Sequence, residues 1–178
     1  MVMEKRNPIL IFTGVGKGKT TAALGMALRA CGRGQRILIL QFIKSDSSVG
    51  ELTALKYLPR VEVIQMGRGF VPSVTAPAFP EHCQAAYQAL KIASDVLQSK
   101  RYDLIILDEI CTAMAKGLIT EDQVIEVIDQ SSREDSCLIL TGRGATDRLI
   151  SKADTVTEMC CIKHGLEEGW TAQRGVEY

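Results

Sequence analysis

Residues 8–22 read PILIFTGVGKGKTTA, a short apolar run followed at once by a loop with three glycines and two lysines. A phosphate-binding loop (P-loop) requires this order, in which a strand leads through a glycine-rich turn into a helix. The usual pattern is G-x-x-x-x-G-K-[ST]. Here Thr13 stands at its first position, while Gly18, Lys19 and Thr20 occupy the last three. The stretch therefore predicts a nucleotide-binding α/β protein.

The rest of the chain alternates apolar runs with segments of helical length, as expected for an open α/β sheet with right-handed crossovers. Three of the runs are nearly continuous in Ile, Leu and Val, which is typical of parallel strands covered on both faces. We expect an open, mostly parallel sheet of about six strands with helices on both faces, the P-loop NTPase or RecA-like architecture, in one domain over residues 1–178. The expected strands are 8–13, 36–43, 61–66, 102–108, 137–142 and 155–163, and the expected helices are 19–31, 51–58, 81–99 and 120–130.

The glycine-rich loop supplies the expected phosphate site. Consecutive backbone N–H groups and the positive end of the following helix bind phosphate oxygens, and the glycines let the backbone approach closely. Lys19 would reach a terminal or bridging phosphate, and the hydroxyl of Thr20 would bind Mg²⁺. The predicted nucleotide-binding residues are Thr13, Gly14, Val15, Gly16, Lys17, Gly18, Lys19, Thr20 and Thr21.

A second motif, LIILDE at 104–109, supplies the expected metal partner. Four apolar residues followed by Asp108 place a carboxylate at the carboxyl end of a buried strand, where Mg²⁺ is held beside a P-loop. Glu109 is open to three interpretations: a metal ligand, a group that aligns a water for hydrolysis, or an acid favoured by a helix N-terminus. The predicted metal ligands are thus Thr20, Asp108 and Glu109.

Other polar residues follow the predicted strands at the same edge of the sheet, where open α/β sheets bind their ligands. Residues 44–48, Arg68, Arg143 and His164 follow strands two, three, five and six. Each residue alone is readily explained as a solvated loop residue, and His164 equally as a structural histidine. Their convergence on one edge makes Arg143 and His164 candidates for ligand binding.

Composition narrows the function classes. Lysines plus arginines equal aspartates plus glutamates at 21 each, so no large positive field is present to hold a nucleic acid. The six cysteines, at 31, 83, 111, 137, 160 and 161, form no C-x-x-C pair and are interpreted as reduced residues that fill the core. No apolar run reaches the roughly 18 residues of a membrane span, and no signal peptide is evident, so we expect a cytoplasmic protein.

Three kinds of phosphate chemistry remain open from these residues. The first is hydrolysis or phosphoryl transfer, for which Glu109 could position the nucleophile. However, the arginine-rich lid of small kinases is lacking, since Arg133 is the only arginine between 110 and 135. The second is a nucleotide-binding switch, but the guanine motif N-K-x-D does not occur. The third is the use of ATP as an alkylating agent at its 5′ carbon.

Several motifs occur in a fixed order along the chain: FTGVGKGKTTAALGMALRACGRG, ILQFIK, GE at 50–51, MGRGF, LIILDEI, LTGRGA, ADTVTEM and KHGLEEGWTAQRGVEY. Together they closely resemble the P-loop ATP:cob(I)alamin (corrinoid) adenosyltransferase family, over nearly the whole chain from about residue 9. The GKGKTTA loop, TGRGA and the KH…AQRG ending are jointly far more specific than the P-loop alone.

This resemblance implies an enzyme that transfers the 5′-deoxyadenosyl group of ATP to Co(I) of a reduced corrinoid, with tripolyphosphate leaving. Co(I) is an exceptionally strong nucleophile and needs no protein base. The protein can therefore contribute the position of the 5′ carbon and stabilisation of the departing triphosphate. Lys17 beside Lys19, with Mg²⁺ near Thr20, suits that need and makes both lysines catalytic candidates along with Glu109. The resemblance also implies a homodimer and leaves room for a Co(II) reductase as a partner.

The segment 67–80, GRGFVPSVTAPAFP, is the expected corrinoid-facing loop. Fourteen residues without regular structure are unusual in a compact domain and favour a functional role. Phe70 matches the aromatic position of the family, whereas Pro72 stands where the family usually has Trp. Val15 replaces the usual Asn of the loop, and only about eight residues precede the first strand. The alternatives to the transferase are a Mg²⁺-dependent ATPase and a non-catalytic paralogue that binds ATP or corrinoid.

Overall fold

A computed structural model describes residues 7–131 and 135–176 and contains a six-stranded sheet in which neighbouring strands pair in parallel. The strand order is β3-β2-β4-β5-β1-β6. This arrangement confirms the predicted α/β fold class. It also places β5 between β1, which leads into the glycine-rich loop, and β4, which ends at Asp108. The strands are β1 (Ile9–Thr13), β2 (Ile37–Gln41), β3 (Val61–Gln65), β4 (Leu104–Asp108), β5 (Cys137–Thr141) and β6 (Thr155–Glu158).

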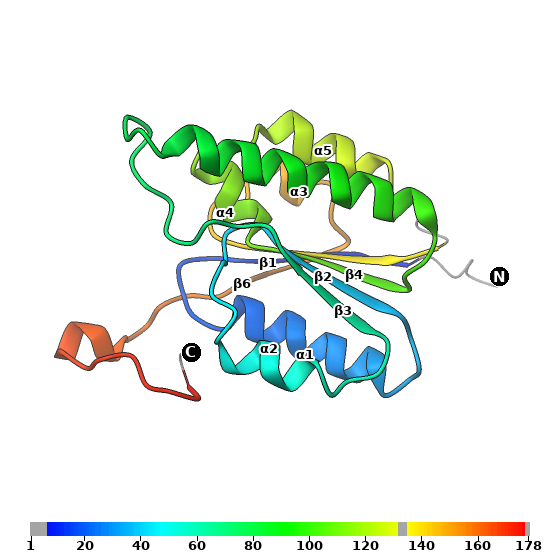
Figure 1. Ribbon diagram of the computed structural model, residues 1–178, viewed down its shortest axis with the longest axis horizontal. Coiled ribbons are helices and arrows are strands. Elements are labelled where there is room, and N and C mark those ends of the chain that lie inside the picture. Colours follow the sequence, from blue (N-terminus) through cyan, green and yellow to red (C-terminus); the bar gives the residue numbers. More distant parts are fainter. Residues whose placement is uncertain (1–6, 132–134, 177–178) are drawn as a thin grey trace.

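Helices cover both faces of the sheet, as predicted (Figure 1). Helices α1 and α2 lie on one face, and α3, α4 and α5 lie on the other. Each face has its own cluster of buried apolar side chains. The helices are α1 (Lys19–Cys31), α2 (Gly50–Leu55), α3 (Phe79–Ser99), α4 (Ile110–Ala115), α5 (Glu121–Asp129), α6 (Asp147–Ile150) and the short 3-10 helix η1 (Gly165–Glu168).

The central strands are buried as their sequences predict. Every residue of β2 and β4 is buried, and so are four of the five residues of β5. Helix α1 presents three small residues to this sheet, Ala23, Ala27 and Ala30, which are all buried. Small side chains let α1 approach the sheet closely. The first turn of the helix therefore lies near the carboxyl ends of the strands.

Several boundaries differ from the predicted ones. Strand β6 ends at Glu158 rather than at residue 163, because its partner β1 pairs with it only as far as Thr13. Helix α3 begins at Phe79, two residues earlier than predicted, and accommodates Pro80 in its first turn, where a missing N–H leaves no hydrogen bond unmade. Helix α5 begins with a capping box, in which Thr120 and Gln123 bond to each other's backbone N–H groups. The short helices α4 and α6 were not predicted.

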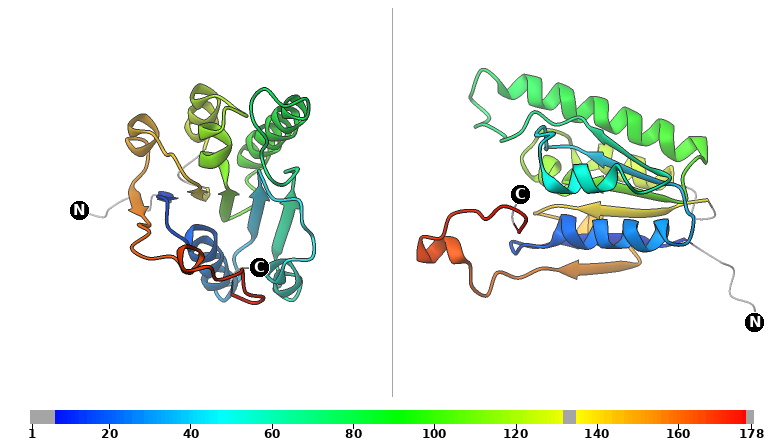
Figure 2. Two further views of the ribbon diagram at one scale, coloured as in Figure 1. Left: turned by 90° about the vertical axis from the view of Figure 1, so that its left-hand side faces the viewer. Right: turned by 60° about the horizontal axis from the view of Figure 1, so that its bottom comes forward.

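The cysteines do not all fill the core. Cys111 is buried, which raises the pKa of its thiol to about 12. Cys137 is half-buried, and its pKa is raised to about 11, mainly by burial. Cys160 and Cys161 are exposed, so their assignment to the core is wrong. The reason is the early end of β6, which leaves both residues in an extended tail that runs past the sheet (Figure 2).

The loop between β3 and α3 projects at the same end of the molecule as the glycine-rich loop (Figure 1). Val71 and Phe79 are buried and anchor it, whereas Phe70 is 93% exposed. At its start Gly67 passes directly over the backbone of Ile43, where an added Cβ would lie 2.0 Å from the Ile43 carbonyl. Across the described ranges, no helix is both long and apolar enough to cross a membrane.

Candidate nucleotide site

The glycine-rich loop turns between the end of β1 at Thr13 and the start of α1 at Lys19. Its shape depends on glycine at two positions for different reasons. Gly18 has a φ of 103°, a backbone conformation that residues with a side chain rarely adopt. Gly16 donates its N–H to the Met159 carbonyl at 2.6 Å, and an added Cβ would lie 2.6 Å from that same oxygen. The loop is therefore braced from behind by the segment that follows β6.

Lys19 lies inside this loop. Its side chain is only 7% exposed, and its ammonium donates to the carbonyls of Gly14 at 2.9 Å and Gly16 at 2.5 Å. Burial lowers the pKa of Lys19 below its usual value, the Arg143 guanidinium lowers it further, and the Glu109 carboxylate partly opposes both. A cation that is buried and crowded by another cation is well prepared to bind an anion.

Asp108 is fully buried at the end of β4 and joins four elements through its carboxylate. Its Oδ1 accepts hydrogen bonds from the hydroxyls of Thr20 and Thr141, both at 2.7 Å. Its Oδ2 accepts from the Gln41 amide at 3.0 Å and lies 3.8 Å from the Lys44 ammonium. The structure thus brings Thr20 and Asp108, both predicted as metal ligands, into direct contact.

The Lys44 ammonium is shared with a second acid. It donates to Glu51 in the first turn of α2 at 2.9 Å. Burial is the largest single influence on the pKa of Glu51 and raises it, but the hydrogen bond from Lys44, a backbone hydrogen bond and the Lys44 charge together outweigh it and hold that pKa below its usual value. Lys44 therefore stands beside the P-loop threonine and Asp108 as a cation already paired with a neighbouring carboxylate.

Glu109 is the N-cap residue directly before α4 and has an unusual backbone conformation, with a φ of 64°. Its N–H donates to the Thr141 hydroxyl at 2.9 Å, and its carboxylate accepts a hydrogen bond from Thr112 one turn later. Thr112 also accepts the backbone N–H of Arg143 at 2.9 Å. Thr112 thus links the Glu109 carboxylate to the backbone of Arg143, and the charges of both residues act on the pKa of Lys19. The Glu109 carboxylate is engaged within its own helical turn.

Comparisons with known proteins identify the group to which this arrangement belongs. A sequence model described as "ATP:corrinoid adenosyltransferase BtuR/CobO/CobP" matches residues 5–178. The chain belongs to the ATP:corrinoid adenosyltransferase family. A corrinoid adenosyltransferase of Pseudomonas aeruginosa is 36% identical over 176 residues, which cover 98% of this chain and 85% of the relative. The corrinoid adenosyltransferase CobA of Salmonella typhimurium is also 36% identical, over 98% of this chain and 87% of its own length.

Solved structures give the fold independently of this family. A KaiC-like protein of Pyrococcus horikoshii superimposes with a TM-score of 0.60 at 13% identity, over 89% of this chain and 75% of its own. The flagellar accessory protein FlaH of Methanocaldococcus jannaschii gives 0.57 at 12% identity, over 86% of this chain and 71% of its own. At such identities the likeness concerns the fold alone, and it agrees with the RecA-like architecture predicted from the sequence.

Other residues singled out from the sequence of this adenosyltransferase have side chains that are exposed or are bonded elsewhere. His164 directly precedes the 3-10 helix η1 and caps it, because its Nδ1 accepts the N–H of Leu166 at 3.1 Å. Arg68 forms an exposed ion pair with Glu81 at 2.6 Å. Val15 and Phe70 are exposed side chains, the first on the glycine-rich loop and the second on the loop after β3.

Sequence reasoning missed Gln41, Thr141 and Thr112, all of which complete the surroundings of the two acids in this adenosyltransferase. Gln41 and Thr141 are the last residues of β2 and β5, the strands on either side of β4. For these two residues the available signal was a polar residue directly after a run of four apolar ones. It becomes informative only when the order of the strands is known.

Proposed function

We propose that the family's reaction takes place at the sheet edge formed by the glycine-rich loop, Lys19 and Asp108. In this reaction the 5′-deoxyadenosyl group of ATP is transferred to Co(I) of a reduced corrinoid, and tripolyphosphate leaves. The observation that carries the proposal is the 2.7 Å contact between the Thr20 hydroxyl and the Asp108 carboxylate, one residue after the buried Lys19, whose ammonium is held by the loop. Hydroxyl, carboxylate and ammonium together form a site for a metal-bound phosphate chain.

The loop from Thr13 to Thr21 would bind the phosphates of ATP. The Lys19 ammonium would exchange its two backbone carbonyls for phosphate oxygens, which suit a buried cation better because they carry charge. Thr20 and Asp108 offer hard oxygen donors that fit Mg²⁺, which would neutralise charge on the phosphates when bound. Among the described residues, no group of three or more His, Cys, Asp or Glu side chains is arranged to hold a metal ion by itself, so phosphate oxygens and water would complete the coordination.

In the transfer step the electron pair of Co(I) forms a bond to the 5′ carbon as the bond from that carbon to the triphosphate oxygen breaks. The electron pair of the broken carbon–oxygen bond stays on the oxygen, and the leaving group departs as tripolyphosphate. No proton is transferred in this step, so the chain needs no general base. Cations close to the leaving group would stabilise its developing charge, and Lys17, Lys19 and Arg143 are placed on or next to the loop for that role.

The loop 67–80 would face the corrinoid. It lies at the same end of the sheet as the glycine-rich loop, and it carries Phe70 with its ring almost wholly exposed between buried anchors. An aromatic ring that gains a partner buries a large apolar area, which explains how an exposed position can serve binding. Pro72 replaces the usual Trp of this loop, so Phe70 is the aromatic residue here that would contact the corrinoid.

Hydrolysis of ATP by a water aligned on Glu109 is the second candidate function. The side chain lies close enough to Lys19 to affect its pKa, which places it in the right region. Its carboxylate, however, accepts a hydrogen bond from Thr112. We therefore favour a positioning role for Glu109 over a role as base. The single domain over 1–178 and the cytoplasmic location stay predictions from the sequence, and the homodimer and the Co(II) reductase stay predictions that accompany the resemblance.

An anaerobic assay with Mg-ATP and chemically reduced cobalamin tests the proposal. We expect loss of the Co(I) absorbance together with a light-sensitive alkyl product and tripolyphosphate. ADP and phosphate with Co(I) unchanged would instead identify an ATPase. Binding of both substrates without turnover would identify a carrier.

The variant Phe70→Ala separates the corrinoid site from the nucleotide site. Because the ring is exposed, its removal should leave folding and ATP affinity unchanged. We expect the corrinoid KM to rise about tenfold, the value of one well-placed aromatic contact. Unchanged adenosylation kinetics would show that the loop does not bind the corrinoid.

A further inference from the structure

A row of side-chain hydrogen bonds runs along the end of the sheet from its edge strand to the P-loop helix. Gln65 at the end of β3 donates from Nε2 to Oε1 of Gln41 at 2.9 Å. Gln41 at the end of β2 donates from its own Nε2 to Oδ2 of Asp108 at 3.0 Å. Asp108 in turn accepts the Thr20 hydroxyl on its other oxygen. Both glutamines stand in register with their partners, Gln41 opposite Gln65 on one side and opposite Asp108 on the other.

The donor-to-acceptor direction of these hydrogen bonds is determined at Gln65, the residue of the row that is farthest from the P-loop helix. The Gln65 amide nitrogen also lies 3.2 Å from the backbone carbonyl of Asp46, a group that can only accept. The amide of Gln65 must therefore direct its NH₂ group toward both Asp46 and Gln41, and Gln41 must accept this hydrogen bond with its oxygen. The NH₂ group of Gln41 is then fixed toward Asp108. Because Gln41 is only 1% exposed, water does not offer it an alternative partner.

We propose that Gln41 and Gln65 are positioning residues, which hold Asp108 for the Mg²⁺ ion of bound ATP. This inference rests on the proposed function. The amide engages Oδ2 of Asp108, so the opposite oxygen stays directed at Thr20 on the P-loop helix. A neutral donor fixes the carboxylate without cancelling its charge. Partners of this kind behind a metal ligand typically change metal affinity by about 10–100-fold when removed.

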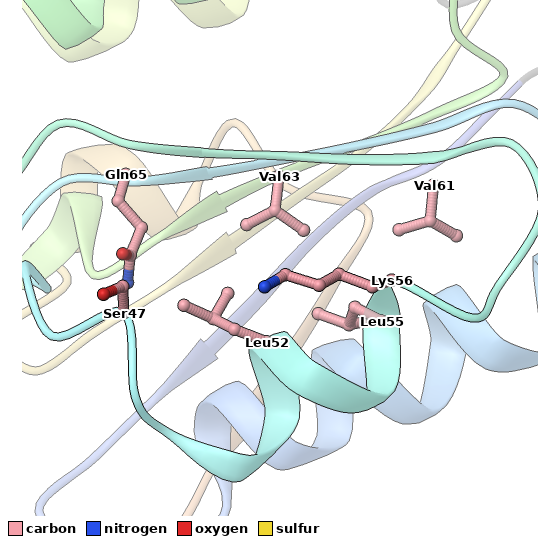
Figure 3. A pocket seen from close by; sticks show the side chains of 7 residues that line it. All are labelled: Ser47, Leu52, Leu55, Lys56, Val61, Val63 and Gln65. Atoms are coloured by element: carbon pink, nitrogen blue, oxygen red, sulfur yellow. The ribbon is translucent and has the colours of Figure 1, made fainter.

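Gln65 acts from outside the nucleotide site. It lines a hollow of about 270 Å³ between α2 and β3, whose apolar wall includes Leu52 and Val63 (Figure 3). Ser47 lies next to it at the same end of that hollow. A substitution at Gln65 therefore changes no group on the P-loop itself, and its effect on ATP must pass through Gln41 and Asp108.

The test measures ATP affinity by calorimetry, once with Mg²⁺ and once with EDTA, in the absence of corrinoid. The ratio of the two dissociation constants gives the gain due to the metal. We expect Gln41→Leu to reduce this gain about 10–100-fold and to leave the affinity in EDTA within about twofold of wild type. Ser136→Ala is the matched control, because it removes a buried hydrogen bond, to the Tyr102 carbonyl, at the opposite end of the sheet. It should leave the gain unchanged.

Substitutions at Gln65 test the direction of the row. In Gln65→Glu the new carboxylate can only accept, so Gln41 should turn its NH₂ group outward and its oxygen toward Asp108. We expect the metal gain to fall by about tenfold or more, whereas Gln65→Met, which leaves the Gln41 oxygen without its donor, should cause a smaller loss. If only the added charge mattered, Gln65→Glu would increase the metal gain, because a negative charge near the site would strengthen Mg²⁺ binding.

The outcomes separate this inference from the proposed function. A wild-type protein without any metal gain would overturn the metal site and the positioning role together. A normal gain that is lost in Asp108→Asn but kept in Gln41→Leu and Gln65→Glu would overturn the positioning role alone. Circular dichroism and thermal unfolding check that each variant folds. If Gln41→Leu does not fold, the two Gln65 variants at a half-buried position decide the matter.

Discussion

Two aspartates frame strand β4, and they are held in opposite ways. Asp103 comes just before the strand, and its carboxylate binds the Arg36 guanidinium at 2.8 Å and 3.2 Å and the Arg36 backbone N–H at 2.8 Å. Asp108 ends the strand and is bonded by two hydroxyls and an amide, with the Lys44 ammonium farther away at 3.8 Å. The first side chain is 33% exposed and the second is buried.

The difference shows how one residue type serves two purposes on the same strand. The Arg36 hydrogen bond holds the pKa of Asp103 below its usual value, and the resulting ion pair ties two strand ends together. Its charge is already matched by a fixed cation. The charge of Asp108 is oriented by neutral donors, so it remains available to a cation that arrives with the nucleotide. The aspartate at the amino end of β4 thus serves stability, and the one at the carboxyl end would serve the reaction.

The largest expected effect at the carboxyl end comes from Lys19→Met, which keeps the length of the side chain and removes its charge. Because Lys19 would contact the phosphates throughout the reaction, we expect adenosylation to fall on the order of 10²–10³-fold, the usual loss for one buried donor at a reacting centre. Initial rates of Co(I) consumption at several ATP concentrations provide the measurement. A loss below threefold would mean that the ammonium stays on its carbonyls in the working enzyme.

A smaller effect at the carboxyl end concerns the pH dependence of ATP binding through Lys19. Burial and Arg143 lower the pKa of Lys19 in the free protein, whereas bound phosphates would raise it. ATP binding should therefore take up protons, up to one per site, at alkaline pH between the two pKa values. ATP affinity should weaken as the pH rises through the lowered value. Calorimetry in two buffers of different ionisation enthalpy measures this uptake, and Lys19→Met should abolish it.

The smallest expected effect belongs to the amino end. Arg36→Ala removes an exposed ion pair, so we expect adenosylation to be unchanged and the melting temperature to fall by at most about 2–4 °C. The lowered pKa of Asp103 means that the pair contributes stability above the usual aspartate value of 3.8 and loses it as the pH falls through the folded-state value. The difference in melting temperature from wild type should accordingly shrink on acidification. A large loss of activity would remove the distinction between the two ends.

Local sequence predicted the parts of the site that depend on neighbours in the chain. The glycine-rich loop and the acid at the end of β4 each lie within one short motif, so their spacing sufficed. Gln41 and Thr141 could not be found in this way, because they meet Asp108 only through the order β2-β4-β5. The same limit explains the cysteine error: the sequence of 155–163 continues as a strand, but its partner β1 ends at Thr13.

The most direct test of the account compares Asp108→Asn with Asp103→Asn in the anaerobic adenosylation assay, with rates scaled to folded protein. The two variants make the same change at the two ends of one strand. We predict that Asp108→Asn loses on the order of 100-fold or more in rate, since it removes the charge that would hold the metal, while Asp103→Asn keeps the wild-type rate. Equal rates for the two variants would contradict the assignment of the site to the carboxyl end of β4.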